Sequence, residues 1–151
     1  MNAPTTLRPL SQTECTAKLA EGCVGRVGFV VDGRVHVLPV NYSADATGEC
    51  LYRTEDESLL VRVAGQSVVF EVDGFDETHQ TGWSVCVHGT AHEVLVPRGP
   101  TASRLIERSV ISWAPGPRDR WFAIKPDVLT GRQLPMTGVA DRTGWIQGVV
   151  S

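Results

Sequence analysis

Apolar residues dominate both strands of a hairpin predicted in the stretch VVDGRVHVLPVNY. Residues 24–31 and 34–42 are rich in valine and are separated by Asp32 and Gly33. An Asp-Gly pair between two apolar runs is the strongest short-range signal for a two-residue hairpin turn. The return strand contains Pro39, which cannot donate a ladder hydrogen bond. The pattern therefore places Pro39 at an edge or a bulge of the sheet.

A two-residue turn also fixes which residues of the hairpin face one another. Phe29 is expected opposite His36 on one face, and Arg26 is expected opposite Pro39 on the other. Both faces are largely apolar, which is typical of a ribbon that is covered on both sides. One face can fill a small barrel, and the other needs a ligand or another subunit.

Four further runs of apolar and β-branched residues predict the remaining strands. These runs span residues 49–54, 67–73, 82–96 and 120–134. Gly89 lies inside the third run and is expected to mark a bulge or a bend.

Two capping-box patterns predict short helices between the strands. The pattern S-x-x-E at Ser11 opens a helix that Gly22 ends, and T-x-x-E at Thr54 opens a second. A third helix is expected over 101–110. Six strands with two or three short helices at strand ends favour a mainly β chain that forms a closed antiparallel barrel.

The length of 151 residues suits one domain. We expect a flexible lead over residues 1–9, the barrel over 10–134 and a tail over 135–151.

The net charge of −3 gives no electrostatic footprint for nucleic acid. No apolar run approaches the roughly 20 residues of a membrane-spanning helix, and the first ten residues lack the apolar region of a secretory signal. The four cysteines have no C-x-x-C spacing, so we expect mostly buried, reduced thiols in a cytoplasmic protein.

No motif of a side-chain-driven enzyme is present in the sequence, so no catalytic residue is assigned. His88 and His92 lie in a β-branched run, where four residues span about 13 Å, and nothing nearby completes a metal site. We therefore expect no bound metal.

Arg53, Thr54 and Ser58 follow a strand directly into a predicted helix, where a guanidinium, hydroxyls and free amides could converge on a phosphate. An ordinary helix cap beside a surface arginine explains the same residues. The acidic run 55–57 would repel a phosphate at this point.

Trp83 and Trp121 each open a long strand. Both are expected in the core by default, although a flat β ribbon also offers a surface on which an aromatic cofactor can stack.

These features together resemble one family, the pyridoxamine 5′-phosphate oxidase-like, FMN-binding split β-barrel proteins, and within it the small single-domain, nitroimidazole-reductase-like branch. Four stretches carry the resemblance, in order, from residue 10 to 134: LSQTECTAKLAEGCVGRVGFVVDGRVHVLPVNY, LYRTEDESLL, VVFEVDGFDETHQTGWSVCVHGTAHEV and PGPRDRWFAIKPDVLTGRQL. The resemblance implies a six-stranded split barrel.

The resemblance also implies a set of cofactor contacts. The strand through Pro39, Val40 and Asn41 would bond the edge of the flavin ring, while Arg53, Thr54 and Ser58 would hold its phosphate. Leu59 stands where many relatives carry a lysine, which removes one positive partner of that phosphate. Further wall residues implied for the cofactor site are Trp83, Ser84 and Trp121.

A homodimeric FMN-dependent oxidoreductase that acts on a small molecule is the activity the resemblance implies. Relatives that use a deazaflavin suggest an alternative cofactor, although the chain has no obvious run of basic residues for an acidic tail. A third alternative is a non-catalytic flavin- or heme-binding barrel.

Overall fold

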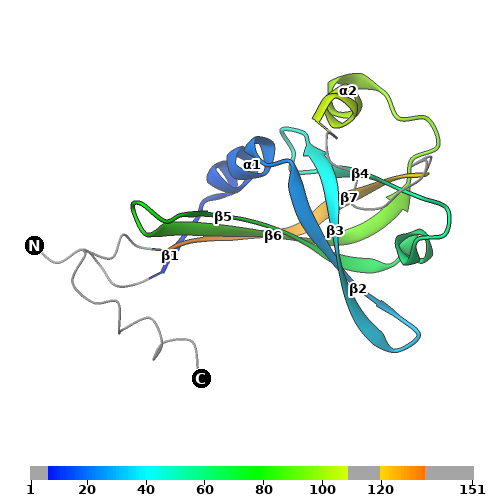
Figure 1. The fold of residues 1–151 in the computed structure, drawn as a ribbon, viewed down its shortest axis with the longest axis horizontal. Coiled ribbons are helices and arrows are strands. Elements are labelled where there is room, and N and C mark those ends of the chain that lie inside the picture. The colour runs from blue at the N-terminus through cyan, green and yellow to red at the C-terminus, as the bar shows by residue number, and fades with distance from the viewer. Residues whose placement is uncertain (1–6, 109–119, 135–151) are drawn as a thin grey trace, which may run out of the picture.

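A closed ring of six antiparallel strands forms the body of the molecule (Figure 1). The computed structural model describes residues 7–108 and 120–134. Along the ring the order is β7-β4-β3-β2-β5-β6, and β6 pairs again with β7. The strands are β2 (Val24–Val31), β3 (Arg34–Ala44), β4 (Cys50–Thr54), β5 (Ser67–Asp76), β6 (Thr81–Glu93) and β7 (Arg120–Leu134). The predicted six-stranded antiparallel split-barrel fold is confirmed.

The β2–β3 hairpin has the predicted register. Phe29 lies opposite His36 and Arg26 lies opposite Pro39. Asp32 and Gly33 both have positive φ angles, of 51° and 72°, as a two-residue type I′ turn requires.

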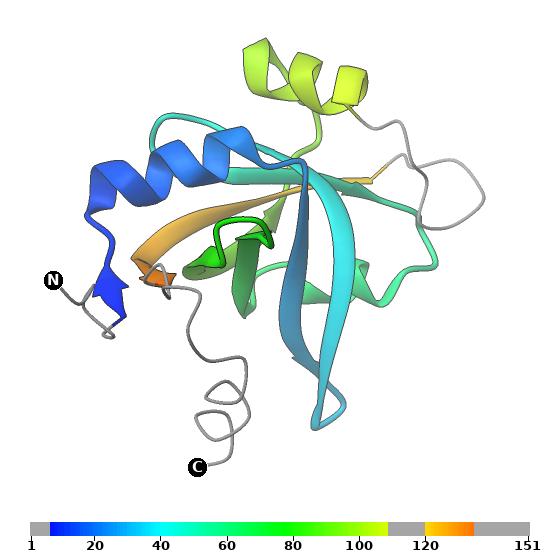
Figure 2. The same ribbon diagram turned by 60° about the vertical axis from the view of Figure 1, so that its left-hand side comes forward.

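Short ladders join this hairpin to the rest of the ring, and its tip projects away from the body (Figures 1 and 2). On one side β3 pairs with β4 only over Tyr42–Ala44. On the other side β2 pairs with β5 over Arg26–Gly28. The ring is therefore split beside the hairpin.

Helix α1 (Gln12–Glu21) is anchored to the barrel by the core and by a hydrogen bond. Leu19 is fully buried in the main core cluster, which also contains Phe70 of β5 and Phe122 of β7. The Tyr42 hydroxyl donates a hydrogen bond of 2.6 Å to the Leu19 carbonyl.

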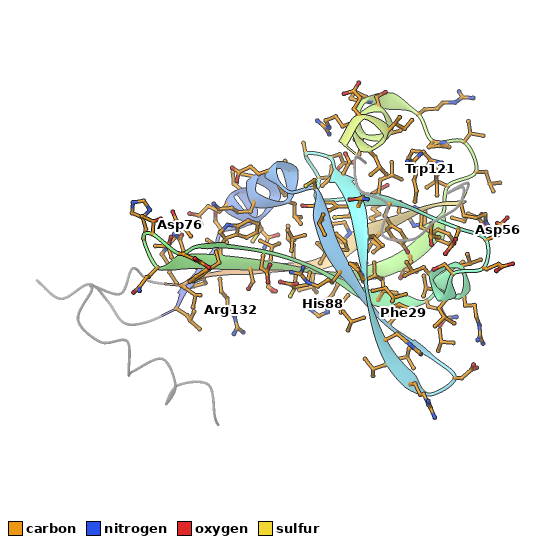
Figure 3. All side chains as sticks on the ribbon, in the orientation of Figure 1. Phe29, Asp56, Asp76, His88, Trp121 and Arg132 are labelled. Carbon is orange, nitrogen blue, oxygen red and sulfur yellow. The ribbon has the colours of Figure 1, made fainter. Side chains whose placement is uncertain are left out.

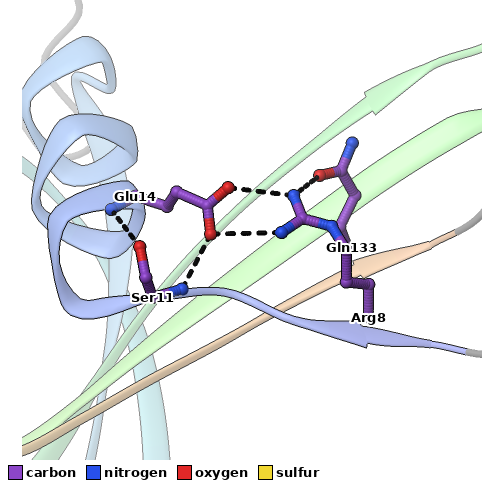
Figure 4. Close-up of polar contacts among 4 residues, drawn as sticks. All are labelled: Arg8, Ser11, Glu14 and Gln133. Carbon is purple, nitrogen blue, oxygen red and sulfur yellow. Dashed lines mark hydrogen bonds and ion pairs between the residues drawn. The ribbon is translucent and has the colours of Figure 1, made fainter.

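The capping box predicted at the start of α1 is confirmed (Figure 4). The Glu14 backbone N–H donates to the Ser11 hydroxyl at 3.1 Å, and the Ser11 N–H donates to the Glu14 carboxylate at 2.7 Å. Arg8 donates to the same carboxylate at 3.0 Å and to the Gln133 side chain at 2.7 Å.

A short strand that was not predicted, β1 (Arg8–Pro9), pairs with the end of β7. It lies within the segment expected to be a flexible lead. The remainder of that lead, and the predicted tail over 135–151, lie outside the described residues.

The second predicted helix, expected from Thr54 through Leu59, Leu60 and Val63, is present but starts later than predicted. Thr54 ends β4 opposite Arg120 and is buried, so its side chain does not cap a helix. The segment that follows forms a 3₁₀ helix, η1 (Leu59–Val63), whose cap is Ser58. The Leu60 N–H donates to the Ser58 hydroxyl at 3.2 Å.

Helix α2 (Gly99–Arg108) confirms the predicted third helix up to the last described residue before the gap. It covers the outer side of β4 and β7, as Figure 2 shows. Within the described ranges, no helix combines the length and apolar character needed to cross a membrane.

The predicted irregularity at Gly89 is confirmed. The register between β6 and β7 shifts between His88 and Gly89. A Cβ atom at Gly89 would collide with the carbonyl oxygen of Lys125, so only glycine allows the strands to approach here.

All four cysteines are free thiols, as predicted. Cys15 and Cys50 are buried, Cys86 is partly buried and Cys23 is exposed. Burial raises the pKa of Cys15, Cys50 and Cys86, so these thiols are not activated as thiolates.

Candidate flavin-binding site

The gap between β3 and β4 is the centre of the candidate site. The ladder between these strands ends at the pair Tyr42–Tyr52. Beyond this pair, β3 continues toward Arg34 with only β2 as its strand neighbour in the described structure, and β4 continues to Thr54 along β7. The edge of β3 and the end of β4 therefore separate from each other at the Tyr42–Tyr52 pair.

Successive residues of β3 direct their backbone N–H and C=O groups alternately toward β2 and toward this edge. The Tyr42 N–H donates to the Cys23 carbonyl at 3.0 Å, which makes Tyr42 a hydrogen-bonded position. Because such positions recur at every second residue of an antiparallel pair, the backbone of Val40 also faces β2. Pro39 falls on the alternate positions, so its missing N–H removes no bond to β2. This placement explains why a proline is tolerated in an apolar strand.

The side chains at this point also separate by face. Val40 is buried in the barrel core, where its Cβ side lies opposite Gly25. Pro39 is exposed on the outer face, and Asn41 is partly buried on the same side. Within the candidate site, Val40 therefore contributes to the floor rather than to the edge.

Arg53 and Trp121 form a cation–π pair on the outer side of β4 and β7. They are direct register partners, and the Arg53 guanidinium carbon lies 5.3 Å from the centre of the Trp121 ring. Both side chains are partly buried. The structure thus brings together two residues that were predicted for one site from distant parts of the sequence.

Arg120 neutralises part of the acidic run that precedes η1. Its guanidinium donates to Glu93 through Nε and Nη2, and to Asp56 at 3.2 Å through Nη1. The Arg120 side chain also holds the pKa of the Glu93 carboxyl below its usual range. Asp56, which Figure 3 places in the loop before η1, is therefore balanced by a cation that sequence analysis had not paired with it.

The remaining predicted phosphate residues occupy the start of η1. Ser58 is partly buried and its hydroxyl already accepts the Leu60 N–H. Leu59 is exposed, and Thr54 is buried at the end of β4. Because η1 is a single short 3₁₀ segment, it lacks the macrodipole that the predicted α-helix would have supplied.

Trp83 and Ser84 lie apart from these residues within one chain. Trp83 pairs with Gln133, at the opposite end of β7 from Trp121, and an extended strand of this length separates them by roughly 40 Å. Trp83 packs against the core, and the Lys18 ammonium lies 5.1 Å from its ring centre.

Comparison with known proteins gives consistent matches. The family model described as pyridoxamine 5′-phosphate oxidase matches residues 11–133. The uncharacterized protein Rv0080 of Mycobacterium tuberculosis is 33% identical over 131 residues, which cover 83% of this chain and 84% of that protein. The chain belongs to the pyridoxamine 5′-phosphate oxidase family.

Two solved structures also resemble this family member. An FAD-binding protein from Mycobacterium smegmatis is 29% identical and superposes with a TM-score of 0.64 over 85% of this chain and 98% of that one. An FAD-binding protein from Mesorhizobium loti is 24% identical, with a TM-score of 0.68 over 85% and 96% of the two chains, which supports the fold.

Five register partners form a row across the outer face of the sheet. Register pairs place Val37, Gly28, Val69, His88 and Val128 side by side across β3, β2, β5, β6 and β7. Val37 and Val128 are 61% and 53% exposed, and His88 is also exposed. In Figure 3 His88 lies on the side of the sheet opposite α1.

A charged cluster on the same face was not recognised from the sequence. Arg26 of β2 pairs with Glu71 at 2.9 Å and with Asp73 at 2.7 Å. Their partner lies 45 residues away from Glu71 in sequence, and only the β2–β5 pairing brings it close.

One buried polar group has no partner among the described residues. The Tyr52 hydroxyl is fully buried and makes no hydrogen bond, and burial raises its pKa above the usual range. Tyr52 stacks on Phe122 with ring centres 5.8 Å apart.

His88 and His92 both lie on β6, as the β-branched pattern predicts. The described ranges contain no group of three or more His, Cys, Asp or Glu side chains that could hold a metal ion.

Proposed function

We propose that this chain is an FMN-binding oxidoreductase that acts on a small molecule. The observation that carries the proposal is the gap between β3 and β4, where β3 leaves β4 and, among the described strands, pairs only with β2; the cation–π pair of Arg53 and Trp121 lies on the neighbouring β4 and β7. Membership of the pyridoxamine 5′-phosphate oxidase family and the names of two FAD-binding relatives support it. A bound flavin would supply the hydride and electron chemistry.

The flavin ring would lie along the open edge of β3. The Pro39 carbonyl and the backbone of Asn41 are in register to bond the ring edge, while Val40 closes the floor. Between Arg34 and Pro39, no strand of the described structure pairs with this edge of β3. The residues present therefore fit an aromatic ring with hydrogen-bonding groups on its rim.

The phosphate would be held chiefly by Arg53. Its guanidinium makes no ion pair with a carboxylate in the described structure, so its donors remain available. Thr54 follows Arg53 at the end of β4 and Ser58 caps η1, and we include both in the proposed phosphate site. Because Leu59 supplies no charge, we expect affinity for the phosphate to depend strongly on Arg53.

The proposed assembly is a homodimer with the cofactor near the subunit interface. The outer face of the hairpin exposes Val30, Val35 and Val37, which are 58%, 76% and 61% accessible in one chain. An apolar face of this kind favours association with another protein surface. A partner subunit could also bring Trp83 and Ser84 toward the site, which one chain alone does not.

Absorption spectroscopy of the purified protein, with mass spectrometry of the released compound, tests the cofactor. Bound FMN is the expected result. FAD, which shares the ribityl phosphate, would retain the site and change the cofactor, whereas a deazaflavin or heme would replace the proposed chemistry. A colourless protein that fails to bind added FMN or FAD would overturn the proposal.

Affinity for FMN tests the phosphate contact directly. Arg53→Ala should weaken FMN binding about tenfold or more, because a hydrogen bond to a charged group contributes roughly 1.5–3 kcal/mol. Arg8→Ala removes the same charge at the far end of β7 and should leave the affinity unchanged. Turnover of reduced nicotinamide by the loaded protein would then distinguish an enzyme from a carrier.

A further inference from the structure

Trp121 covers one face of the Arg53 guanidinium. The two residues are direct register partners, and the guanidinium carbon of Arg53 lies over the indole ring, 5.3 Å from its centre. Stacking on an aromatic face leaves the edges of a guanidinium free, and its N–H donors lie along those edges. The pair therefore orients the donors of Arg53 before any ligand arrives.

Helix α2 fixes Trp121 in turn. The ring packs against a cluster formed by Leu51, Ala102, Leu105 and Ala123, which lies between α2 and the sheet. The Trp121 carbonyl also accepts a hydrogen bond of 2.8 Å from the Val94 N–H. Figure 3 shows Trp121 below α2. The indole ring is thus held by packing that does not involve Arg53.

The neighbouring cation cannot replace Arg53 in this role. Arg120 is the register partner of Thr54, and its guanidinium is hydrogen-bonded to Glu93 and Asp56. Its donors are directed at these two carboxylates. In the described structure, the contact with the Trp121 ring is the side-chain interaction that orients Arg53.

We propose that Trp121 is a positioning residue for the flavin phosphate: it orients Arg53 and thereby selects phosphorylated flavins over riboflavin. The inference rests on the proposed function, because it requires Arg53 to contact the phosphate. A preoriented guanidinium loses less conformational freedom on binding, so the cation–π contact increases affinity only for ligands that carry the phosphate.

The test is the ratio of the riboflavin dissociation constant to the FMN dissociation constant, measured by calorimetry. The proteins compared are the wild type, Trp121→Leu, Trp121→Phe, Arg53→Ala and the Arg53→Ala/Trp121→Leu double variant. A general loss of structure would weaken the binding of both ligands and leave this ratio unchanged. We expect Trp121→Leu to lower the ratio about fivefold, and Trp121→Phe to retain most of it. In the Arg53→Ala background, Trp121→Leu should have no further effect on the ratio.

Each alternative result overturns a defined part of the argument. A wild-type protein that binds neither ligand, or binds both equally, removes the proposed phosphate site and this inference with it. A ratio that falls in Arg53→Ala but not in Trp121→Leu retains the phosphate contact and rejects the positioning role. A ratio that Trp121→Leu lowers even without Arg53 means that the indole acts on the ligand directly and also rejects that role.

Discussion

Arg26 of β2 lies directly opposite Glu71 of β5, and their side chains form an ion pair of 2.9 Å. This pair spans the ladder between β2 and β5, which consists of only three residue pairs. It is one of the few polar interactions that join the hairpin to the rest of the ring.

Arg26→Met should therefore destabilise the protein by about 1 kcal/mol, the upper end for partly exposed pairs. Urea unfolding measures the change in free energy. The matched control is Arg62→Met, which breaks the more exposed pair with Asp32, and we expect a smaller change than for Arg26→Met. Equal effects of the two substitutions would contradict a special role for the β2–β5 junction.

Glu14 gives a prediction about pH. The hydrogen bond from Arg8, together with the Ser11 N–H, lowers its pKa from 4.5 to about 2. A carboxyl whose pKa is lower in the folded state stabilises the fold at pH values above its unfolded-state pKa. This stabilisation is lost as the pH falls from the unfolded-state pKa through the folded-state pKa. The stability difference between wild type and Glu14→Gln should therefore be full at pH 7 and shrink between pH 4.5 and 2. A difference that stays constant down to pH 2 would rule out the contact.

The two buried tyrosines should respond in opposite ways to the loss of their hydroxyl groups. Tyr52→Phe removes a buried hydroxyl without a partner in the described structure and should be neutral or stabilising by up to about 1 kcal/mol. Tyr42→Phe breaks the hydrogen bond to Leu19 and should cost about 1 kcal/mol. Thermal unfolding of both variants compares them, and a clear loss in Tyr52→Phe would reveal an unrecognised partner.

Val37 tests the proposed dimer. Val37→Glu places a charge on the exposed apolar face of the hairpin and should shift the protein toward monomer in sedimentation velocity runs. Leu95→Glu is the control, because Leu95 is 85% exposed and lies on the segment after β6, away from the hairpin. A dimer that survives Val37→Glu and dissociates with Leu95→Glu would place the interface elsewhere.

The sequence predicted the local features of the fold well. The Asp32-Gly33 turn fixes the hairpin register through its own backbone angles, so no distant contact was needed to derive it. The same holds for the capping box at Ser11. In each case the residues that decide the conformation are neighbours in the chain.

Features that depend on distant strands could not be predicted in this way. Thr54 matches a capping box, yet its pairing with Arg120 keeps it in β4 and buries it. The ion pairs of Arg26 and Arg120 each join different strands or loops. For the candidate site, the resemblance identified Arg53 and Trp121, but only the register of β4 and β7 shows that they are in contact.

The pairing of Arg8 with Gln133 has a consequence for how the protein is made. β7 contacts β1, β4 and β6, so the last described strand completes three ladders at once. A nascent chain on the ribosome cannot close the ring until β7 has emerged. Such long sequence separations slow folding and leave unpaired edges exposed meanwhile. We therefore expect the barrel to form only after translation is nearly complete. A chain shortened before β7 should be unable to fold.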